Sequence, residues 1–464
     1  MEDKDTEQIE TSKEQSLPEK QPKKASSLTL MKKGDYSVHI LIEEIKNCIQ
    51  LSDSKQPFPI VKVSCFDKSK RTAKTEIGCT DYVFGEHFYF DKTNLTTEML
   101  DSEKIIIEVY DANNTKRKDY YGINEFDFEY IYNNPGHAIH NLWIALANPE
   151  SEMITQVRGY LKVSMSVLHE NDPRIELEPK ESDCSNCMVP SQIKMEYKQI
   201  SIHFFRGEEL PDMDSVLFNK KVNRECDGYI EVKYMGILRK TKVVPMKNEI
   251  IEWNEIVDIP VALPAVSQKI VMIVKDKDPT GFDIVGSIEL KVDDIIKEHK
   301  YDELTYLNIY GSPLNKKGKI YDQMNYNAEI GSKWKGRILV KITTSDIDAP
   351  LAQVRPIEDE NLIREVYSHE RNHQWEIHYR IYSTLFLPEP KDYYGIRISI
   401  QDSETLIKSR QAKGRNIEWN EGGVIPTTAL TNDINELPDI FIYLTNKKGE
   451  KIFVSNVSKH LSFI

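Results

Sequence analysis

The chain has 464 residues, of which 39% are hydrophobic and 29% charged, with a formal net charge of −13 at pH 7. This length exceeds what one hydrophobic core supports and predicts roughly two to four domains. The acidic balance argues against a nucleic-acid-binding protein, because affinity for phosphates depends on clustered Lys and Arg. No run of roughly 18 to 20 apolar residues is present and the N-terminus is charged from its second residue, so we expect a cytoplasmic protein without a signal peptide or membrane span.

The first segment, residues 1–34, is rich in Glu, Lys, Gln, Ser and Pro and has almost no aromatic or β-branched residues. Such a segment buries too little apolar area to offset the entropy of ordering, so we predict a disordered, charged tail. From Tyr36 onward the texture changes to short runs of alternating polar and apolar residues. This period of two is typical of β-strands. Strands are predicted at 36–42, 60–64 and 104–110.

The same order of features then recurs, with extended runs at 200–205, 229–234 and 270–275. The phrase Ile251-Glu-Trp-Asn-Glu255 is also repeated residue for residue at 417–421. A recurring pattern of short strands predicts related units, and the fold class is therefore all-β, with tandem antiparallel β-sandwiches. The predicted boundaries are a domain at 35–169, a linker at 170–197, a domain at 198–345, a linker or helix at 346–369 and a partial or degenerate domain at 370–464.

Six cysteines in a chain of this length predict reduced thiols rather than a disulfide framework. Cys184 and Cys187 form one CxxC pair. A zinc site would need a second pair of ligands, and none is evident in the predicted linker around them. We therefore expect no metal at this pair.

The order of strands and loops, with carboxylates in the loop before an x-x-Gly strand, resembles the C2 domain, a Greek-key sandwich. Finer phrases resemble ferlins, among them Asn133-Asn-Pro-Gly-His137, Leu210-Pro-Asp-Met-Asp214 and Leu307-Asn-Ile-Tyr-Gly-Ser-Pro313. The resemblance covers about 36–464 and implies the second and third C2 domains of a ferlin with the region that follows them. The further C2 domains and the C-terminal transmembrane anchor of ferlins have no counterpart in this sequence, so membrane fusion is not implied.

The resemblance implies a calcium site in the second unit, where two loops at one end of the sandwich supply carboxylates. Calcium prefers about six to eight oxygen ligands, and Asp side chains provide them. Asp also favours turns and exposed loop tips, which is the alternative explanation for these residues. The candidate ligands are Asp214, Asp227, Asp276, Asp278 and Asp283.

The first and third units are poorer in these carboxylates. The first unit has Asn113 between Asp111 and Asp119, and Phe58 stands where the family has an Asp. The third unit has Thr445-Asn-Lys-Lys-Gly-Glu450 where the acidic loop would lie. We expect no calcium site in either unit.

A basic run in the first unit is a candidate contact for anionic lipid that needs no calcium. The alternative is a solvated face of a sheet. The run consists of Lys68, Lys70, Arg71 and Lys74.

One motif points to an enzyme. His369-Glu370-x-x-His373 matches H-E-x-x-H, which on a helix places two imidazoles one turn apart for zinc, with the Glu as general base. A zinc peptidase needs a cleft before this motif, whereas the preceding residues are assigned to a sandwich. Because no phosphate-binding Gly loop or nucleophile elbow is found either, zinc metallopeptidase activity remains a minor alternative to a non-enzymatic protein.

The leading functional hypothesis is a multi-C2 protein that associates peripherally with anionic phospholipid in response to calcium and scaffolds protein partners in vesicle or membrane trafficking. The alternative is a calcium-independent component of a cytoskeletal or ciliary (axonemal) assembly. Neither hypothesis involves nucleic acid or a small-molecule substrate.

Overall fold

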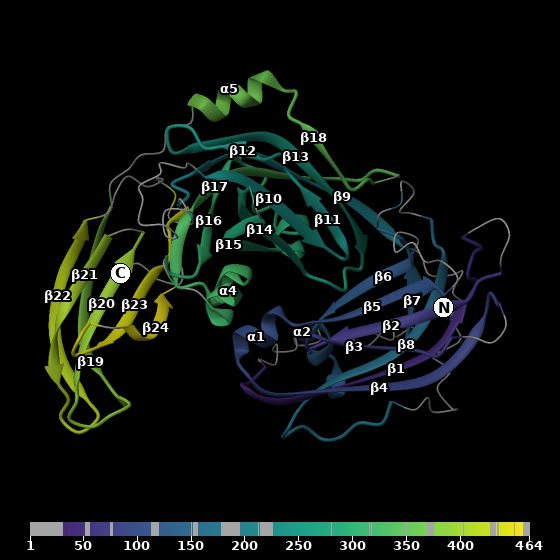
Figure 1. The fold of residues 1–464 in the computed structure, drawn as a ribbon, viewed down its shortest axis with the longest axis horizontal. Helices are drawn as coiled ribbons and strands as arrows, with labels where there is room; N and C mark the ends of the chain where they lie inside the picture. The colour runs from purple at the N-terminus through teal and green to yellow at the C-terminus, as the bar shows by residue number, and fades with distance from the viewer. Residues whose placement is uncertain are drawn as a thin grey trace, which may run out of the picture. The chain divides into compact units, whose positions relative to one another are not determined.

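The computed structural model describes residues 31–457 except for 52–55, 75–77, 113–119, 152–155, 178–194, 214–225, 369–374, 427–432 and shorter gaps at 150, 212, 280, 315, 317, 349, 402, 434–435 and 450. Nearly all of the predicted tail therefore lies outside the described residues, as do Cys184 and Cys187. The predicted all-β class with tandem antiparallel sandwiches is confirmed (Figure 1).

The first sandwich consists of two four-stranded antiparallel sheets, in the orders β4-β1-β8-β7 and β3-β2-β5-β6. Alternate residues of β5, Ile105, Ile107 and Val109, are completely buried and face the core between the sheets. The alternation in the sequence is thus the physical origin of these strands. The strands are β1 (Gly34–Lys46), β2 (Pro59–Cys65), β3 (Lys68–Arg71), β4 (Tyr82–Leu95), β5 (Lys104–Asp111), β6 (Tyr120–Asp127), β7 (Ala138–Leu146) and β8 (Gly159–His169).

The second sandwich is one continuous path of paired strands, β11-β10-β14-β15-β16-β17-β9-β13-β18, with β12 paired to β10. Its layers are joined where Ser287 of β15 pairs with Tyr310 of β16. The strands are β9 (Glu196–Glu208), β10 (Asp227–Tyr234), β11 (Ile237–Lys240), β12 (Val244–Pro245), β13 (Ile250–Leu263), β14 (Lys269–Asp278), β15 (Gly281–Lys291), β16 (Thr305–Gly311), β17 (Lys333–Ser345) and β18 (Gln353–Pro356).

The edge strand β18 lies in the segment 346–369, which we predicted as a linker or helix. It pairs with β13, and Arg355 Nε lies 2.8 Å from Asp258 Oδ2, a carboxylate that is almost fully buried. This ion pair holds β18 against β13, because separating the strands would leave the buried Asp258 carboxylate without a partner, which is unfavourable in free energy. The predicted linker therefore contributes to the second sandwich.

The third sandwich lies within 370–464. One sheet pairs β19 (Glu376–Thr384) with β22 (Ile417–Pro426), and the other has the order β21-β20-β23-β24. Buried side chains of β20 and β22, including Ile396, Ile398 and Trp419, form one core. The strands of the second sheet are β20 (Tyr393–Ile400), β21 (Ser403–Gln411), β23 (Ile440–Asn446) and β24 (Lys451–Val457).

The helices are short and lie between strands. They are α1 (Thr97–Ser102), α2 (Phe128–Tyr132), α3 (Val292–Ile296), α4 (Lys319–Tyr326) and α5 (Glu360–Ser368), with 3-10 turns η1 (Pro135–His137) and η5 (Ala328–Ile330). Within the described part of the chain, no helix has the length and apolarity that a bilayer span requires.

The repeated Ile-Glu-Trp-Asn-Glu phrase builds the same local structure twice. Trp253 and Trp419 are fully buried, and the following Asn254 and Asn420 have φ values of 47° and 51°. Asn tolerates this left-handed region better than most residues, and the pairing of β13 with β9 and of β22 with β19 shifts register at this point. In both places the bulge directs the indole into the core, so the identical residues have the same packing role in the two sandwiches.

The third sandwich should depend on its tryptophan. Trp419→Ala is expected to destabilise it by about 3–5 kcal/mol, because the cavity left behind cannot fully collapse. Hydrogen–deuterium exchange of the β20 and β23 amides in the full chain should rise sharply. Tyr382→Ala, on the paired strand and 62% exposed, serves as the control. Unchanged exchange in the Trp419 variant would contradict this account of the core.

Candidate calcium and lipid sites

Three of the predicted calcium ligands lie on one hairpin. In the pairing of β14 with β15, Asp276 stands opposite Asp283, and Asp278 stands opposite Gly281. Directly opposed residues share a face of the sheet, and residues two apart on a strand do so as well. Asp276, Asp278 and Asp283 therefore present their carboxylates on one face of the hairpin, near its turn.

This hairpin is tighter than the sequence suggested. The sequence placed the three carboxylates in a loop, whereas strand pairing continues to Asp278 and only residues 279 and 280 connect the two strands. Spacing along the sequence does not show where the pairing of two strands ends. Because the three Asp residues belong to paired strands, their backbone positions are fixed by the hydrogen bonds of the sheet.

Asp227, at the start of β10, lies beside the same site. Its backbone N–H donates to Asp276 Oδ1 at 2.8 Å, and its neighbour Gly228 pairs with Asp276. Two candidate ligands thus lie on adjacent strands. The fifth candidate, Asp214, lies outside the described residues.

The four described candidates occupy neighbouring positions on adjacent strands, but their carboxylates do not surround a common point. No three of them have carboxylate oxygens within 4.8 Å of one another in the part of the chain that is described. An ion bound here would have to draw these side chains together.

Lys275, the neighbour of Asp276 on β14, forms an ion pair on the opposite face of the sheet. Lys275 Nζ lies 2.7 Å from Glu231 Oε2, and both side chains are almost fully buried. Burial alone would raise the pKa of Glu231, but hydrogen bonds from Lys240 and Lys275 outweigh it and lower that pKa. The charge of Lys275 is therefore compensated by Glu231 and does not oppose a cation at Asp276.

The corresponding region of the first sandwich retains little of the acidic set. Asp111 is 7% exposed, and Tyr121 donates its hydroxyl to Asp111 Oδ2 at 3.4 Å. Asn113 and Asp119 lie outside the described residues, and so does the motif His369-Glu370-x-x-His373, directly after α5.

A different carboxylate cluster, not foreseen from the sequence, joins distant segments. Oxygens of Asp101 (α1), Glu289 (β15) and Glu329 (η5) all lie within 4.8 Å of one another. Lys269 Nζ forms ion pairs with Asp101 and with Glu289, the latter at 2.8 Å. Loss of hydration and the nearby Asp101 raise the pKa of Glu329 to about 7. Because Lys269 already supplies a cation, the cluster is explained as an ion-pair network.

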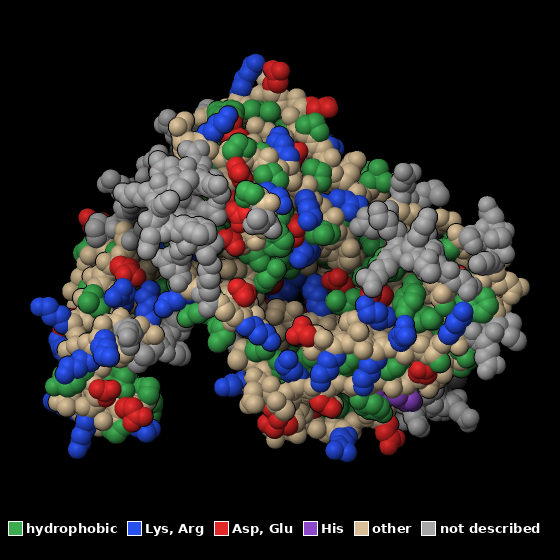
Figure 2. Space-filling view, in the orientation of Figure 1, with side chains coloured by type: hydrophobic (Ala, Val, Ile, Leu, Met, Phe, Trp, Pro, Cys, Tyr) green, Lys and Arg blue, Asp and Glu red, His purple; other side chains and the backbone are tan. Residues whose placement is uncertain are grey.

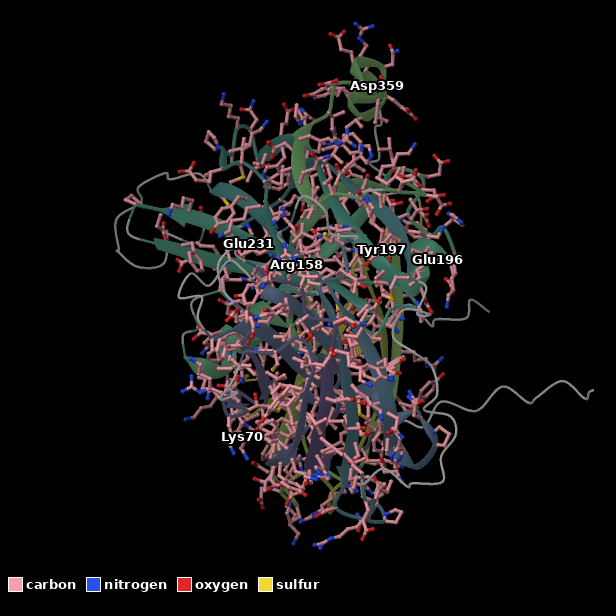
Figure 3. All side chains as sticks on the ribbon, turned by 90° about the vertical axis from the view of Figure 1, so that its right-hand side faces the viewer. Lys70, Arg158, Glu196, Tyr197, Glu231 and Asp359 are labelled. Atoms are coloured by element: carbon pink, nitrogen blue, oxygen red, sulfur yellow. The ribbon has the colours of Figure 1, made fainter. Side chains whose placement is uncertain are left out.

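The basic run occupies the edge strand β3 and the residues just after it, and its four cations are all exposed. Lys70 Nζ donates to Tyr89 O at 2.7 Å and lies 5.2 Å from the Phe90 ring centroid, while Lys68 Nζ lies 3.5 Å from Asp91 O. Figure 3 shows Lys70 at the margin of the molecule, and Figure 2 shows Lys and Arg side chains gathered where β3 and β4 run. An ammonium has three donors, so these contacts leave donors for a further acceptor.

Comparison with known proteins agrees with this fold. The model of the C2 domain matches residues 36–143 and 198–307. Myoferlin of Mus musculus is 27% identical over 375 residues, and myoferlin of Xenopus tropicalis is 28% identical over 360 residues. The chain thus carries two regions that match the C2 domain, and it is similar to a ferlin over most of its length. The resemblance expected from the sequence is confirmed.

The similarity to myoferlin covers 74% of this chain but only 18% of the mouse relative. The chain thus spans about a fifth of that relative's length. Among solved structures, a fragment of Extended-Synaptotagmin 2 with two consecutive C2 domains matches over 71% of this chain and 97% of its own length, at 10% identity and a TM-score of 0.24. A calcium-bound form of that fragment matches at 11% identity and a TM-score of 0.22.

Proposed function

We propose that this protein associates peripherally with anionic phospholipid surfaces and that calcium bound at the β14–β15 hairpin controls the association. The observation that carries the proposal is the register that places Asp276 opposite Asp283, with Asp278 on the same face. The relationship to C2-domain proteins supports it. We assign no catalytic role to the chain.

The mechanism follows from charge. Without a cation, the carboxylates of the hairpin repel one another and also repel anionic headgroups. Calcium brings two positive charges, takes carboxylate oxygens as ligands and cancels two of the negative charges, so the hairpin repels anionic headgroups less. Phe282, at the start of β15, is 45% exposed and precedes Asp283 in the chain, and Lys275 Nζ lies 3.9 Å from its ring centroid. Phe282 stands opposite Lys277 and so points to the other face of the hairpin from the carboxylates, where an exposed aromatic ring is suited to the interfacial region of a bilayer.

The basic strand β3 supplies a second contact that does not need calcium. Each cation close to an anionic surface contributes about 1 kcal/mol of attraction. Lys68 and Lys70 are two apart on the strand and so point to the same side. We therefore propose weak, salt-sensitive membrane contact through β3 that the hairpin strengthens when calcium is present.

Scaffolding of protein partners and a place in vesicle or membrane trafficking are part of the same proposal, because three consecutive sandwiches offer large surfaces beyond the two sites. The relatives reported above give no support to the cytoskeletal or ciliary alternative, so it is not carried forward. The zinc peptidase alternative depends on His369, Glu370 and His373, which lie outside the described residues.

Cosedimentation of the full chain with phosphatidylserine-containing vesicles tests the calcium step. The wild-type chain should pellet with calcium and remain largely in the supernatant with chelator. The double variant Asp276→Asn with Asp278→Asn should need at least tenfold more calcium, because it removes two charges from the site. Asp293→Asn, an exposed carboxylate on α3, is the matched control and should behave as wild type. Equal calcium dependence in all three proteins would reject the site.

The contribution of β3 is tested in the same assay without calcium at low salt. Lys68→Gln with Lys70→Gln should reduce the residual vesicle binding by about tenfold or more, on the basis of about 1 kcal/mol per cation. Lys297→Gln, directly after α3, is the control, since Lys297 is similarly exposed and lies on another element. If the control lowers binding as much as the double variant, the effect is one of net charge and the basic strand has no special role.

A further inference from the structure

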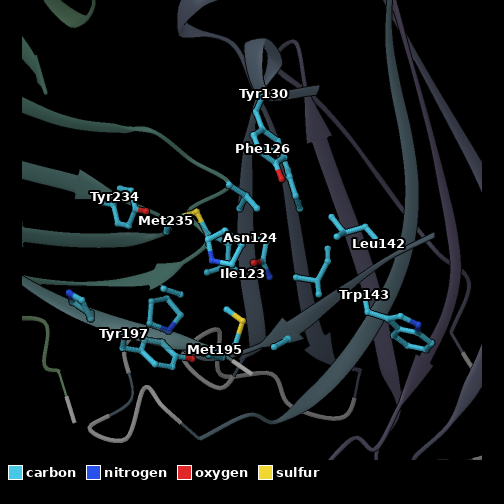
Figure 4. Close-up of a pocket in the computed structure, with 18 of the residues that line it drawn as sticks. Ile123, Asn124, Phe126, Tyr130, Leu142, Trp143, Met195, Tyr197, Tyr234 and Met235 are labelled. Carbon is cyan, nitrogen blue, oxygen red and sulfur yellow. The ribbon is translucent and has the colours of Figure 1, made fainter. Parts of the chain in front are cut away.

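A cavity of about 400 Å³ is lined by residues of both the first and the second sandwich (Figure 4), and none of its described lining residues belongs to the β14–β15 hairpin. One wall comes from β6 and β7 and the other from the β10–β11 turn, β13 and the start of β9. Its volume falls within the range of about 300–1,000 Å³ that is usual for small-molecule sites. The wall is largely apolar and includes Phe126, Leu142, Met195, Tyr197, Met235 and Ala262.

Hydrogen bonds hold the two walls of the cavity together. Gly236 N–H in the β10–β11 turn donates to Glu125 Oε1 at 3.0 Å, and Gln268 N–H donates to Asp127 Oδ2 at 2.5 Å. Gly236 has φ 76°, and a Cβ at this position would lie 2.6 Å from Ile123 Cγ2. The turn can thus approach β6 closely only with glycine there. The cavity is consequently a built feature with fixed walls.

The polarity of the walls selects the chemical class of the ligand. None of the described residues that line the cavity is Lys, Arg, Asp or Glu. A carboxylate or phosphate would therefore find no lysine or arginine as a counter-ion, and its burial would carry a large desolvation cost. Apolar chains, in contrast, gain from leaving water, and the flexible Met195 and Met235 side chains can adapt to their shape.

Two polar groups on the wall are uncharged. Asn124 is 9% exposed and carries an amide, and Tyr197 carries a hydroxyl; Figure 4 shows both among the side chains that line the cavity. Burial raises the pKa of Tyr197, so its phenol stays protonated and can donate a hydrogen bond. Amide and phenol groups both donate and accept, as a hydroxyl does. A ligand with an uncharged, hydroxyl-bearing head would match them.

We propose that this cavity binds a neutral single-chain lipid, with its acyl chain against the apolar wall and its hydroxyl head toward Asn124 and Tyr197. This site is separate from the hairpin and does not depend on calcium. It would give the protein a means of holding one lipid molecule independently of the bilayer surface.

The test uses the full chain without calcium and a series of monoacylglycerols below their aggregation concentrations. Calorimetry should show saturable binding of one molecule, and affinity should rise about fourfold with each added methylene until the cavity is full. The fatty acid of the same chain length, ionised at pH 8, should bind at least tenfold more weakly. No saturable binding, or tighter binding of the fatty acid, would overturn the proposal.

A cavity-filling variant locates the binding. Ala262→Trp places an indole in the cavity and should lower monoacylglycerol affinity at least tenfold while leaving calcium-dependent vesicle binding unchanged, which shows that the chain remains folded. Leu238→Trp is the control, because Leu238 is exposed on β11 and does not line the cavity. If Ala262→Trp unfolds the chain, Ala145→Trp fills the opposite wall instead. Wild-type affinity in a folded cavity-filling variant would show that the lipid binds elsewhere.

Discussion

The functional account rests on the pairing register of β14 with β15. This register places Asp276 directly opposite Asp283, with Asp278 two positions along on the same face. Like charges in these positions destabilise a hairpin unless a cation compensates them. A shift of one residue would send the carboxylates of one strand to the opposite face, where Lys275 and Glu231 are buried. The same register therefore buries the Lys275–Glu231 ion pair on one face and places the three carboxylates on the other.

Much of the fold could be predicted from the sequence, because strands with one buried face alternate visibly. The run from Lys104 to Tyr110 alternates and becomes β5, and the repeated Ile-Glu-Trp-Asn-Glu phrase becomes a bulge with a buried indole in both places. The length of the acidic loop could not be read in this way, because Asp and Lys also occur in strands whose polar face is exposed. Strand β18 was missed for a related reason: an edge strand of four mostly exposed residues has no hydrophobic period.

The candidate sites, like the fold, were predicted in part from the sequence. Sequence spacing brought attention to Asp227, Asp276, Asp278 and Asp283, and all four lie on adjacent strands of one sheet. The network of Asp101, Glu289 and Glu329 around Lys269 was not foreseeable, because these residues are far apart in the chain and each alone is an ordinary surface residue. The apolar cavity was hidden as well, since its walls come from strands whose second, outward face becomes covered only in the folded chain. Contacts between the sandwiches cannot be predicted from local sequence patterns.

Calorimetric titration of the full chain with calcium, in parallel with the variant Asp283→Asn, tests the central claim most directly. Asp283 lies across the ladder from Asp276, so its loss removes one side of the site while leaving the strand register intact. The account predicts saturable binding with a raised thermal midpoint in the wild-type chain, and at least tenfold weaker binding in the variant. Equal binding by the two proteins, or no heat up to millimolar calcium, would contradict it.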